Sequence, residues 1–155
     1  MSPSRIRSLV VAFASAAVVL CSAAPVRAQA SAPAPLRSTV FPSDSARSRK
    51  TGAVSQRSIV DTLTARLKKL EMHETTIPPG AMPHPAHKHL NEELIVVRSG
   101  TIEVLLDGKT LTARTGDIAY MASNEMHGFR NVGPGPATYL VIRMDAPDQP
   151  GDPKP

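Results

Sequence analysis

Short runs of residues that favour β-structure, separated by turn residues, follow one another along the chain from Val54 onwards. No window of helical length carries a convincing 3.6-residue period of hydrophobic positions, so the pattern does not predict a helix. Many short strands at regular spacing are typical of an all-β sandwich or barrel. The runs expected to form strands cover residues 58–77, 92–98, 101–108, 109–115, 118–123, 125–132 and 137–144.

Turn residues mark the ends of these runs. Residues 78–80 (PPG) end the first run, and Ser99-Gly100 and Asp107-Gly108 are signals for a hairpin or a tight turn. Aromatic residues make up 3% of the chain and tryptophan is absent. We therefore expect a hydrophobic core of Ile, Val, Leu and Met.

Composition divides the chain after residue 30 into three parts. Residues 31–59 begin with a segment rich in Pro, Ser, Ala and Arg, which predicts a flexible or extended N-terminal arm. Residues 60–145 contain the expected strands and form the predicted domain. Residues 146–155 (APDQPGDPKP) are predicted to be a disordered tail.

The first 30 residues have the three parts of a secretory signal peptide. Arg5 and Arg7 give a basic start, a short apolar run follows, and residues 28–30 (AQA) supply small residues before the cleavage point. The apolar run is shorter than the roughly 20 residues that a membrane-spanning helix needs. The sequence therefore predicts cleavage after Ala30, export to the periplasm or beyond, and no stable membrane insertion of the mature protein.

Two alternatives remain for this segment, namely an uncleaved anchor and a lipoprotein. Cys21 is the candidate for lipid attachment, but Leu20 precedes it where a small residue is preferred. An earlier cleavage after residues 22–24 (SAA) is disfavoured because Pro25 would follow it.

Removal of the signal peptide changes the chemistry of the chain. The formal net charge falls from +5 to +2, because three arginines and no acidic residues are lost, and the remaining charges alternate in sign. A nucleic-acid partner is therefore not expected. Cys21 is the single cysteine, so the mature protein has no disulfide, thiol nucleophile or thiolate metal ligand.

Three of the five histidines lie within six residues, next to two glutamates. In an extended backbone His87 and His89 point to the same face, and Glu93 keeps that parity whereas Glu92 does not. His127 opens a later strand and would join them if the two strands are neighbours. Three imidazoles and a carboxylate suit a divalent ion such as Fe, Mn, Ni, Cu or Zn. On spacing alone, a histidine-rich segment that binds no metal is an equal alternative.

Two motifs in this region resemble those of the cupin family. Their likeness covers residues 80–131, and the flanking strands extend it to residues 60–145. The first motif consists of Gly80, His87, His89, Glu93 and Gly100, and the second, after a short spacer of residues 101–115, of Gly116, Ala122, Asn124, His127 and Asn131. Together the two motifs are specific for the family.

The chain departs from the family pattern at three places. Six residues instead of five separate Gly80 from His87, so the loop before the first ligand is one residue longer. Ala122 and Asn124 stand where the family usually has Pro and Gly. Because Asn can adopt the left-handed conformation, we expect the turn to be kept.

The resemblance implies an all-β fold, the double-stranded β-helix or jelly-roll β-barrel, with one divalent transition-metal ion in its mouth. The implied ligands are His87, His89, Glu93 and His127, and Gly100, Gly116 and Asn131 are implied structural residues. Glu93 is also a candidate catalytic base, and His84 a candidate acid or base at the rim. Tyr120 and Phe129 are candidates for the substrate pocket, and His73 is expected to have no functional role.

The family includes several kinds of activity, so three functions are compatible with the resemblance. A metal-dependent oxygenase resembling the quercetin-dioxygenase-like small cupins is favoured. A lining with few charges predicts a small, largely apolar or aromatic substrate. The alternatives are a redox-neutral isomerase, decarboxylase or aminohydrolase, and a non-catalytic module that binds or senses a small ligand.

Residues 94–98 (LIVVR) are apolar on both faces of the expected strand. The resemblance implies a homodimer, since small cupins often dimerise by sheet-to-sheet packing, and such a strand fits this arrangement. The segment of residues 31–60 could add a strand to the sheet of the partner.

Overall fold

The computed structural model describes residues 33–148. The signal peptide predicted for residues 1–30 and residues 149–155 of the predicted tail lie outside this part. The described residues form no helix, and therefore none that is long and apolar enough to cross a membrane. Their strands are β1 (Arg47–Thr51), β2 (Val54–Thr62), β3 (Lys69–Ile77), β4 (Glu92–Ser99), β5 (Thr101–Leu106), β6 (Lys109–Arg114), β7 (Ile118–Met121), β8 (His127–Asn131) and β9 (Ala137–Asp145).

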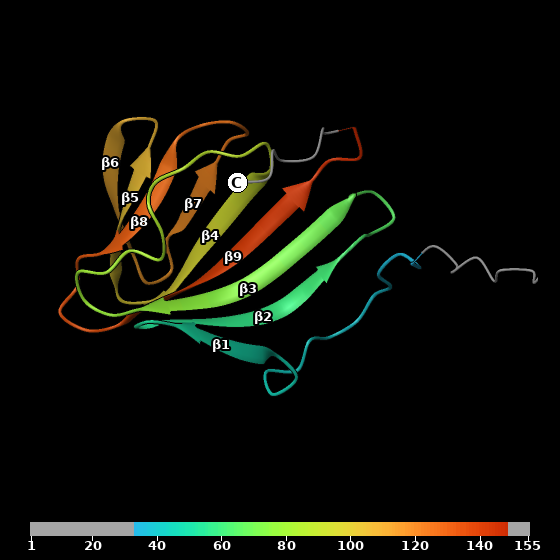
Figure 1. Cartoon of the computed structure of the whole chain (residues 1–155), viewed down its shortest axis with the longest axis horizontal. Coiled ribbons are helices and arrows are strands. Elements are labelled where there is room, and N and C mark those ends of the chain that lie inside the picture. The colour runs from blue at the N-terminus through green and yellow to red at the C-terminus, as the bar shows by residue number, and fades with distance from the viewer. Residues whose placement is uncertain (1–32, 149–155) are drawn as a thin grey trace, which may run out of the picture. The chain divides into compact units, whose positions relative to one another are not determined.

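These strands form two antiparallel sheets, which confirms the predicted all-β class. One sheet has six strands in the order β1-β2-β3-β9-β4-β7, and the other has three in the order β6-β5-β8. Figure 1 shows the three short strands grouped beside the long, curved strands of the larger sheet. Neighbours such as β3 and β9, or β4 and β9, are far apart in sequence, so the fold depends on long-range pairing.

The hydrophobic core lies between the two sheets and follows the alternation of each strand. On β4, Ile95 and Val97 are buried, whereas Leu94 points outward and is half-buried. The expectation of a core without aromatic residues was wrong, because Phe129 and Tyr139 are buried at its centre with ring centroids 5.6 Å apart. No leucine is among the buried core residues of the described chain. Leu106 packs against the edge of the core, whereas Leu94 and Leu140 lie on the outer face of the larger sheet.

The two predicted Gly turns have different roles. Asp107 (φ 44°) and Gly108 (φ 83°) join β5 to β6 in a tight hairpin, as predicted. Gly100 (φ 86°) instead carries the chain from β4 in the larger sheet to β5 in the smaller one. Its backbone lies directly against Ala137, so this corner needs both a positive φ and the absence of a side chain.

Residues 58–77 form two strands instead of the single run that the pattern suggested. Residues 63–68 separate β2 from β3, and the hydroxyl of Thr64 accepts hydrogen bonds from the backbone N–H of Arg66 and of Leu67 at 3.2 and 2.9 Å. A threonine side chain thus stabilises the turn without Gly or Pro. This is why the sequence pattern showed no break.

The sheet begins earlier than residue 60, where the predicted domain was expected to start. Gly52 (φ 59°) reverses the chain between β1 and β2, and β2 pairs with β3 from Ser55 to Thr62. The predicted arm therefore contributes two strands to the sheet of its own chain. Every residue of β1 is exposed, so this edge strand lacks the hydrophobic alternation that identifies a strand in a sequence.

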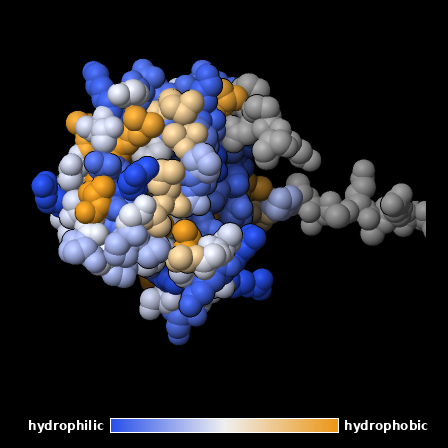
Figure 2. Space-filling model, turned by 60° about the vertical axis from the view of Figure 1, so that its left-hand side comes forward, coloured by the Kyte–Doolittle hydropathy of each residue, from blue (hydrophilic) through white to orange (hydrophobic). Residues whose placement is uncertain are grey.

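On the face drawn in Figure 2, hydrophobic residues are interspersed with hydrophilic ones. Leu111 of β6, which is 57% exposed, is one of the large hydrophobic residues at the surface. Scattered exposure of this kind is ordinary for a folded domain.

The corner at Gly100 predicts an asymmetry between two alanine substitutions. A Cβ atom at Gly100 would lie 2.8 Å from the Cα of Ala137, whereas one at Gly108 would meet no atom within 4 Å, although both residues have positive φ. We expect Gly100→Ala to lower the free energy of unfolding by about 3 kcal/mol or more, and Gly108→Ala by about 1 kcal/mol. Urea unfolding of both variants measures this, and equal losses would contradict the close approach.

Candidate metal centre

Two of the histidines lie on a loop, not on a strand. Residues 83–91 form no continuous ladder, and Pro83 and Pro85 lack the N–H groups that one would need. His87 alone makes a bridge, with two backbone hydrogen bonds to His127 at the start of β8 (2.9 and 2.8 Å). The prediction that a strand places His87 and His89 on the same face was therefore wrong, because these residues do not lie on a strand. The cross-strand bridge brings the histidines together instead.

Three imidazoles meet at this bridge. The ring centroids of His87, His89 and His127 are 4.7 to 5.3 Å apart, and one nitrogen of each lies within 4.8 Å of the others. His89 and His127 are buried, and His87 is the least buried of the three. The spacing fits a single ion bound by all three rings.

Backbone carbonyls fix the orientation of two of these rings. His89 Nδ1 lies 3.1 Å from the carbonyl oxygen of Asn91, and His127 Nδ1 lies 2.9 Å from that of Glu125. Because a carbonyl only accepts, each Nδ1 donates and each Nε2 keeps its lone pair. Both Nε2 atoms, and Nδ1 of His87, are buried without a hydrogen-bond partner. Buried polar atoms of this kind need a partner, and a metal ion is one that fits the three nitrogens.

Glu93 supplies a carboxylate to the same place. It is the second residue of β4, it is 6% exposed, and its Oε2 lies 3.4 Å from Nε2 of His89. Arg143, its partner across the β4–β9 pair, has Nε 3.7 Å from the same oxygen. Burial alone would raise the pKa of Glu93, but His89, His127 and Arg143 together hold it below its usual value.

The protonation of these residues suits a cation. Burial, with the neighbouring histidines acting in the same direction and Glu93 opposing them, lowers the pKa of His87 to about 4. Burial likewise lowers the pKa of His127. At neutral pH His87 and His127 are therefore neutral imidazoles and Glu93 is an ionised carboxylate, the forms that bind a metal ion.

Two asparagines hold the surrounding loops. Asn124 adopts the left-handed conformation (φ 63°) that its motif position requires, and its N–H donates to the carbonyl of His89 at 2.7 Å. The buried amide of Asn131 donates to the carbonyls of Ile77 and Gly135 at 2.9 Å each. Both contacts support the loops on either side of the histidines.

Comparison with known proteins identifies the domain. Residues 73–143 match the family described as the Cupin domain. The chain contains a cupin domain. The solved structures that it resembles show the same fold, so the predicted jelly-roll architecture is confirmed. No curated protein matches the chain.

Three solved structures illustrate the likeness. An RmlC-like cupin from Shewanella frigidimarina has a TM-score of 0.58 at 17% identity over 72% of this chain and 95% of its own. KdgF from Halomonas sp. has 0.60 at 18% identity over 72% and 97%. A predicted oxalate decarboxylase from Thermotoga maritima has 0.61 at 18% identity over 68% and 98%. At these identities the likeness establishes the fold alone.

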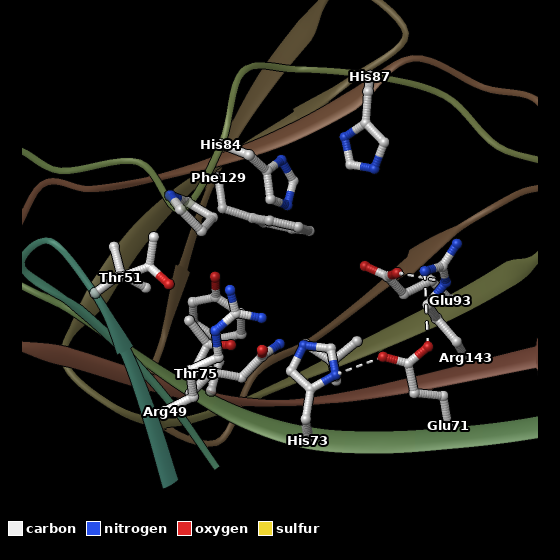
Figure 3. Close-up of a pocket in the computed structure, with 15 residues that line it drawn as sticks. Arg49, Thr51, Glu71, His73, Thr75, His84, His87, Glu93, Phe129 and Arg143 are labelled. Carbon is white, nitrogen blue, oxygen red and sulfur yellow. Dashed lines mark ion pairs between the residues drawn. The ribbon is translucent and has the colours of Figure 1, made fainter. Parts of the chain in front are cut away.

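A cavity of about 380 Å³ opens beside the histidines of this cupin (Figure 3). The expectation of a lining with few charges was wrong, because charged and polar side chains from β1, β2, β3 and β9 face it. Strand alternation explains this result for β3 and β9, where the hydrophobic residues Leu70, Met72, Leu140 and Ile142 have the opposite parity. The lining residues with ionisable side chains are Arg49, Glu71, His73, His84, His87, Glu93, Tyr139 and Arg143.

The predicted site residues do not all lie at this cavity. His84 lines it at the exposed rim, with its ring centroid 4.4 Å from that of His87, and Phe129 lines it from β8. Tyr120 does not, which corrects the prediction. On β7 the residues Ala119 and Met121 point inward, so Tyr120 points outward, is 51% exposed and donates to Glu92 at 2.9 Å.

Sequence reasoning missed several cavity residues. Glu71, His73 and Thr75 alternate along β3 with residues that point outward, and Arg143 has the same parity as the buried Tyr139 and Val141 on β9. The signal in the sequence was that these polar residues of β3 occupy the same alternate positions as Ile77, which is buried. It was overlooked because a polar alternating set also fits a solvent-exposed face.

The Glu71 carboxylate is held by three basic side chains, of which Figure 3 shows His73 and Arg143. His73 Nδ1 lies 3.2 Å, Lys69 Nζ 3.1 Å and Arg143 Nη1 3.8 Å from its oxygens. The His73 contact is the largest influence and lowers the pKa of Glu71 to about 2, with Lys69 and Arg143 acting in the same direction against burial.

This network predicts a pH-dependent contribution to stability. A carboxylate with a lowered pKa stabilises the fold above its unfolded value of 4.5, and this stabilisation is lost as the pH falls from 4.5 towards 2. We expect Glu71→Gln to cost about 1–2 kcal/mol near pH 6, and less than half of that at pH 3. Denaturant unfolding at both pH values measures it. Glu103→Gln, which removes a carboxylate from the smaller sheet, is the control, and a cost for Glu71→Gln that does not change with pH would contradict the network.

Proposed function

We propose that this cupin binds one divalent transition-metal ion through His87, His89, His127 and Glu93. The observation that carries the proposal is the pair of buried Nε2 lone pairs, oriented by backbone carbonyls towards a common point. Imidazole and carboxylate ligands suit Fe, Mn, Ni, Cu or Zn.

We further propose that the centre is catalytic and acts on a small molecule. Four protein ligands leave coordination positions open on an octahedral ion, and the cavity opens beside them. When bound, the ion supplies a Lewis acid that polarises an oxygen atom of the substrate. Glu93 and His84 are the candidate bases, since both line the cavity beside the cluster.

For the reaction, an oxygenase that acts on an aromatic molecule stays the first proposal, because Phe129 and Tyr139 provide aromatic walls. A redox-neutral isomerase, decarboxylase or aminohydrolase is the second. The charged cavity, with Arg143 between two carboxylates, supports it because proton transfers need such groups. Oxygen uptake with catechols and flavonols by the iron- or copper-loaded protein tests the first proposal. Turnover without oxygen would favour the second.

We also propose that the protein is exported. The basic start, the short apolar run and the small residues before Ser31 support this proposal. The intact mass of the protein produced from the full chain in an exporting bacterial host should correspond to a start at Ser31. A mass that still includes residues 1–30 would contradict cleavage.

The ligand set predicts which substitutions remove the metal. We expect His89→Ala and Glu93→Gln each to weaken metal binding by at least about 100-fold, since each removes one of four ligands from a buried centre. Plasma mass spectrometry after dialysis measures the bound metal. Glu92→Gln is the matched control, because Glu92 is adjacent but points outward to Tyr120.

Equal metal loss in Glu92→Gln would contradict the proposed ligands. So would full retention of metal in both ligand variants.

A homodimer is a separate proposal. The outer face of the larger sheet carries Leu94, Val96, Ile118 and Leu140, and Ile118 is 66% exposed. We expect light scattering to give twice the chain mass, and Ile118→Lys to give a monomer because it places a charge in an apolar contact. Leu111→Lys, at an exposed leucine of the smaller sheet, should remain dimeric. A monomeric wild-type protein would contradict the proposal.

A further inference from the structure

One cation in the cavity has no anionic partner in the part of the chain that the structure describes. Arg143 lies near both cavity carboxylates and donates to Asn91 at 2.7 Å. Arg49, from the edge strand β1, has no carboxylate within 4 Å among residues 33–148. Figure 3 shows its side chain directed into the cavity, apart from Glu93 and Arg143. This guanidinium is therefore open to an anion from solution.

The strand register places Arg49 far from the metal ligands. Arg49 pairs with Gln56, Gln56 with Thr75, Thr75 with Tyr139, and Tyr139 with Val97 on β4. Glu93 is four residues from Val97 on β4, which adds roughly 13 Å along the strand to the spacing across the sheet. The cavity thus has two separate polar ends, the histidine cluster and Arg49.

The neutral groups between these ends suit an organic molecule. Gln56 and Thr75 lie in the same cross-strand row as Arg49, and Thr51 lies on the same face of β1. They offer hydrogen-bond donors and acceptors around the guanidinium. Phe129 and Tyr139 line the middle of the cavity with apolar surface. A volume of about 380 Å³ admits a small ligand with one ring.

The charges of the cavity favour a negative ligand. The formal charges of the two arginines and the two glutamates that line the cavity sum to zero. With a divalent ion bound, the cavity would therefore have a net charge of about +2. This count rests on the proposed metal centre. The position of the partnerless guanidinium does not depend on it.

We propose that Arg49 determines substrate specificity by binding the carboxylate of an elongated small molecule whose other end reaches the histidine cluster. The substrate class is then an aromatic or otherwise apolar acid, with an oxygen at the opposite end that suits a metal ion. A guanidinium recognises a carboxylate with two parallel N–H···O hydrogen bonds, which a lysine cannot reproduce.

A matched pair of probes tests this inference. The acid is 3-(3,4-dihydroxyphenyl)propanoate, whose hydroxyl groups and carboxylate are separated by a ring and a two-carbon linker, and the neutral control is its amide. Calorimetric titration is carried out without oxygen on the zinc-loaded protein, because zinc itself cannot oxidise the probe. We expect wild-type protein to bind the acid at least roughly tenfold more tightly than the amide. Arg49→Gln should remove this preference, and Arg49→Lys should keep part of it.

Lys50→Gln is the control variant. It removes the same charge from the neighbouring residue of β1, which does not line the cavity, and it should bind the acid as wild type does. Bound zinc is measured in every sample. Loss of zinc from wild type would contradict the proposed function itself. Full zinc content with no preference for the acid, or with the preference retained in Arg49→Gln, would overturn the role of Arg49 alone.

Discussion

The two backbone hydrogen bonds between His87 and His127 are the contact on which the rest of the centre depends. They attach an irregular, proline-containing loop to the first residue of β8, and so bring together ligands that are forty residues apart in the sequence. The carbonyls of Asn91 and Glu125 then orient two of the rings, which leaves buried lone pairs with no protein donor. A buried polar atom without a partner lowers the stability of the fold, so these nitrogens are expected to bind a ligand at this point.

The larger sheet connects the histidine cluster to Arg49 at the other end of the cavity. Residues that pair across β1, β2, β3, β9 and β4 lie side by side on the inner face of this sheet. These residues are hydrophobic where they face the core and mostly polar where they line the cavity. Arg143 joins the carboxylates of Glu71 and Glu93, so the end of the cavity near the histidine cluster carries its own compensating charge. Arg49 at the edge carries none, and selectivity for a charged substrate can therefore be separate from metal binding.

The sequence was sufficient for the fold class and the Asp107-Gly108 hairpin, because strand spacing and local turn chemistry indicate both. The histidine cluster could be predicted only from the two motifs that resemble those of cupins, since a long-range bridge brings His87 and His127 together. The sequence failed where a residue's role depends on long-range pairing. The strand β1 is polar throughout and becomes a cavity wall only because β2 pairs with β3. Tyr120 and Tyr139 have similar local sequences. Tyr120 is exposed because it alternates with the buried Met121, whereas Tyr139 is buried because it lies on the same face of its strand as the buried Val141.

The most direct test of the metal centre is anomalous diffraction from a crystal of the protein grown with manganese or zinc. The account predicts a single peak at the cluster, about 2.0–2.3 Å from one nitrogen each of His87, His89 and His127 and close to an oxygen of Glu93. A peak elsewhere, for example at Glu71 and His73, or no peak at the cluster, would contradict the account.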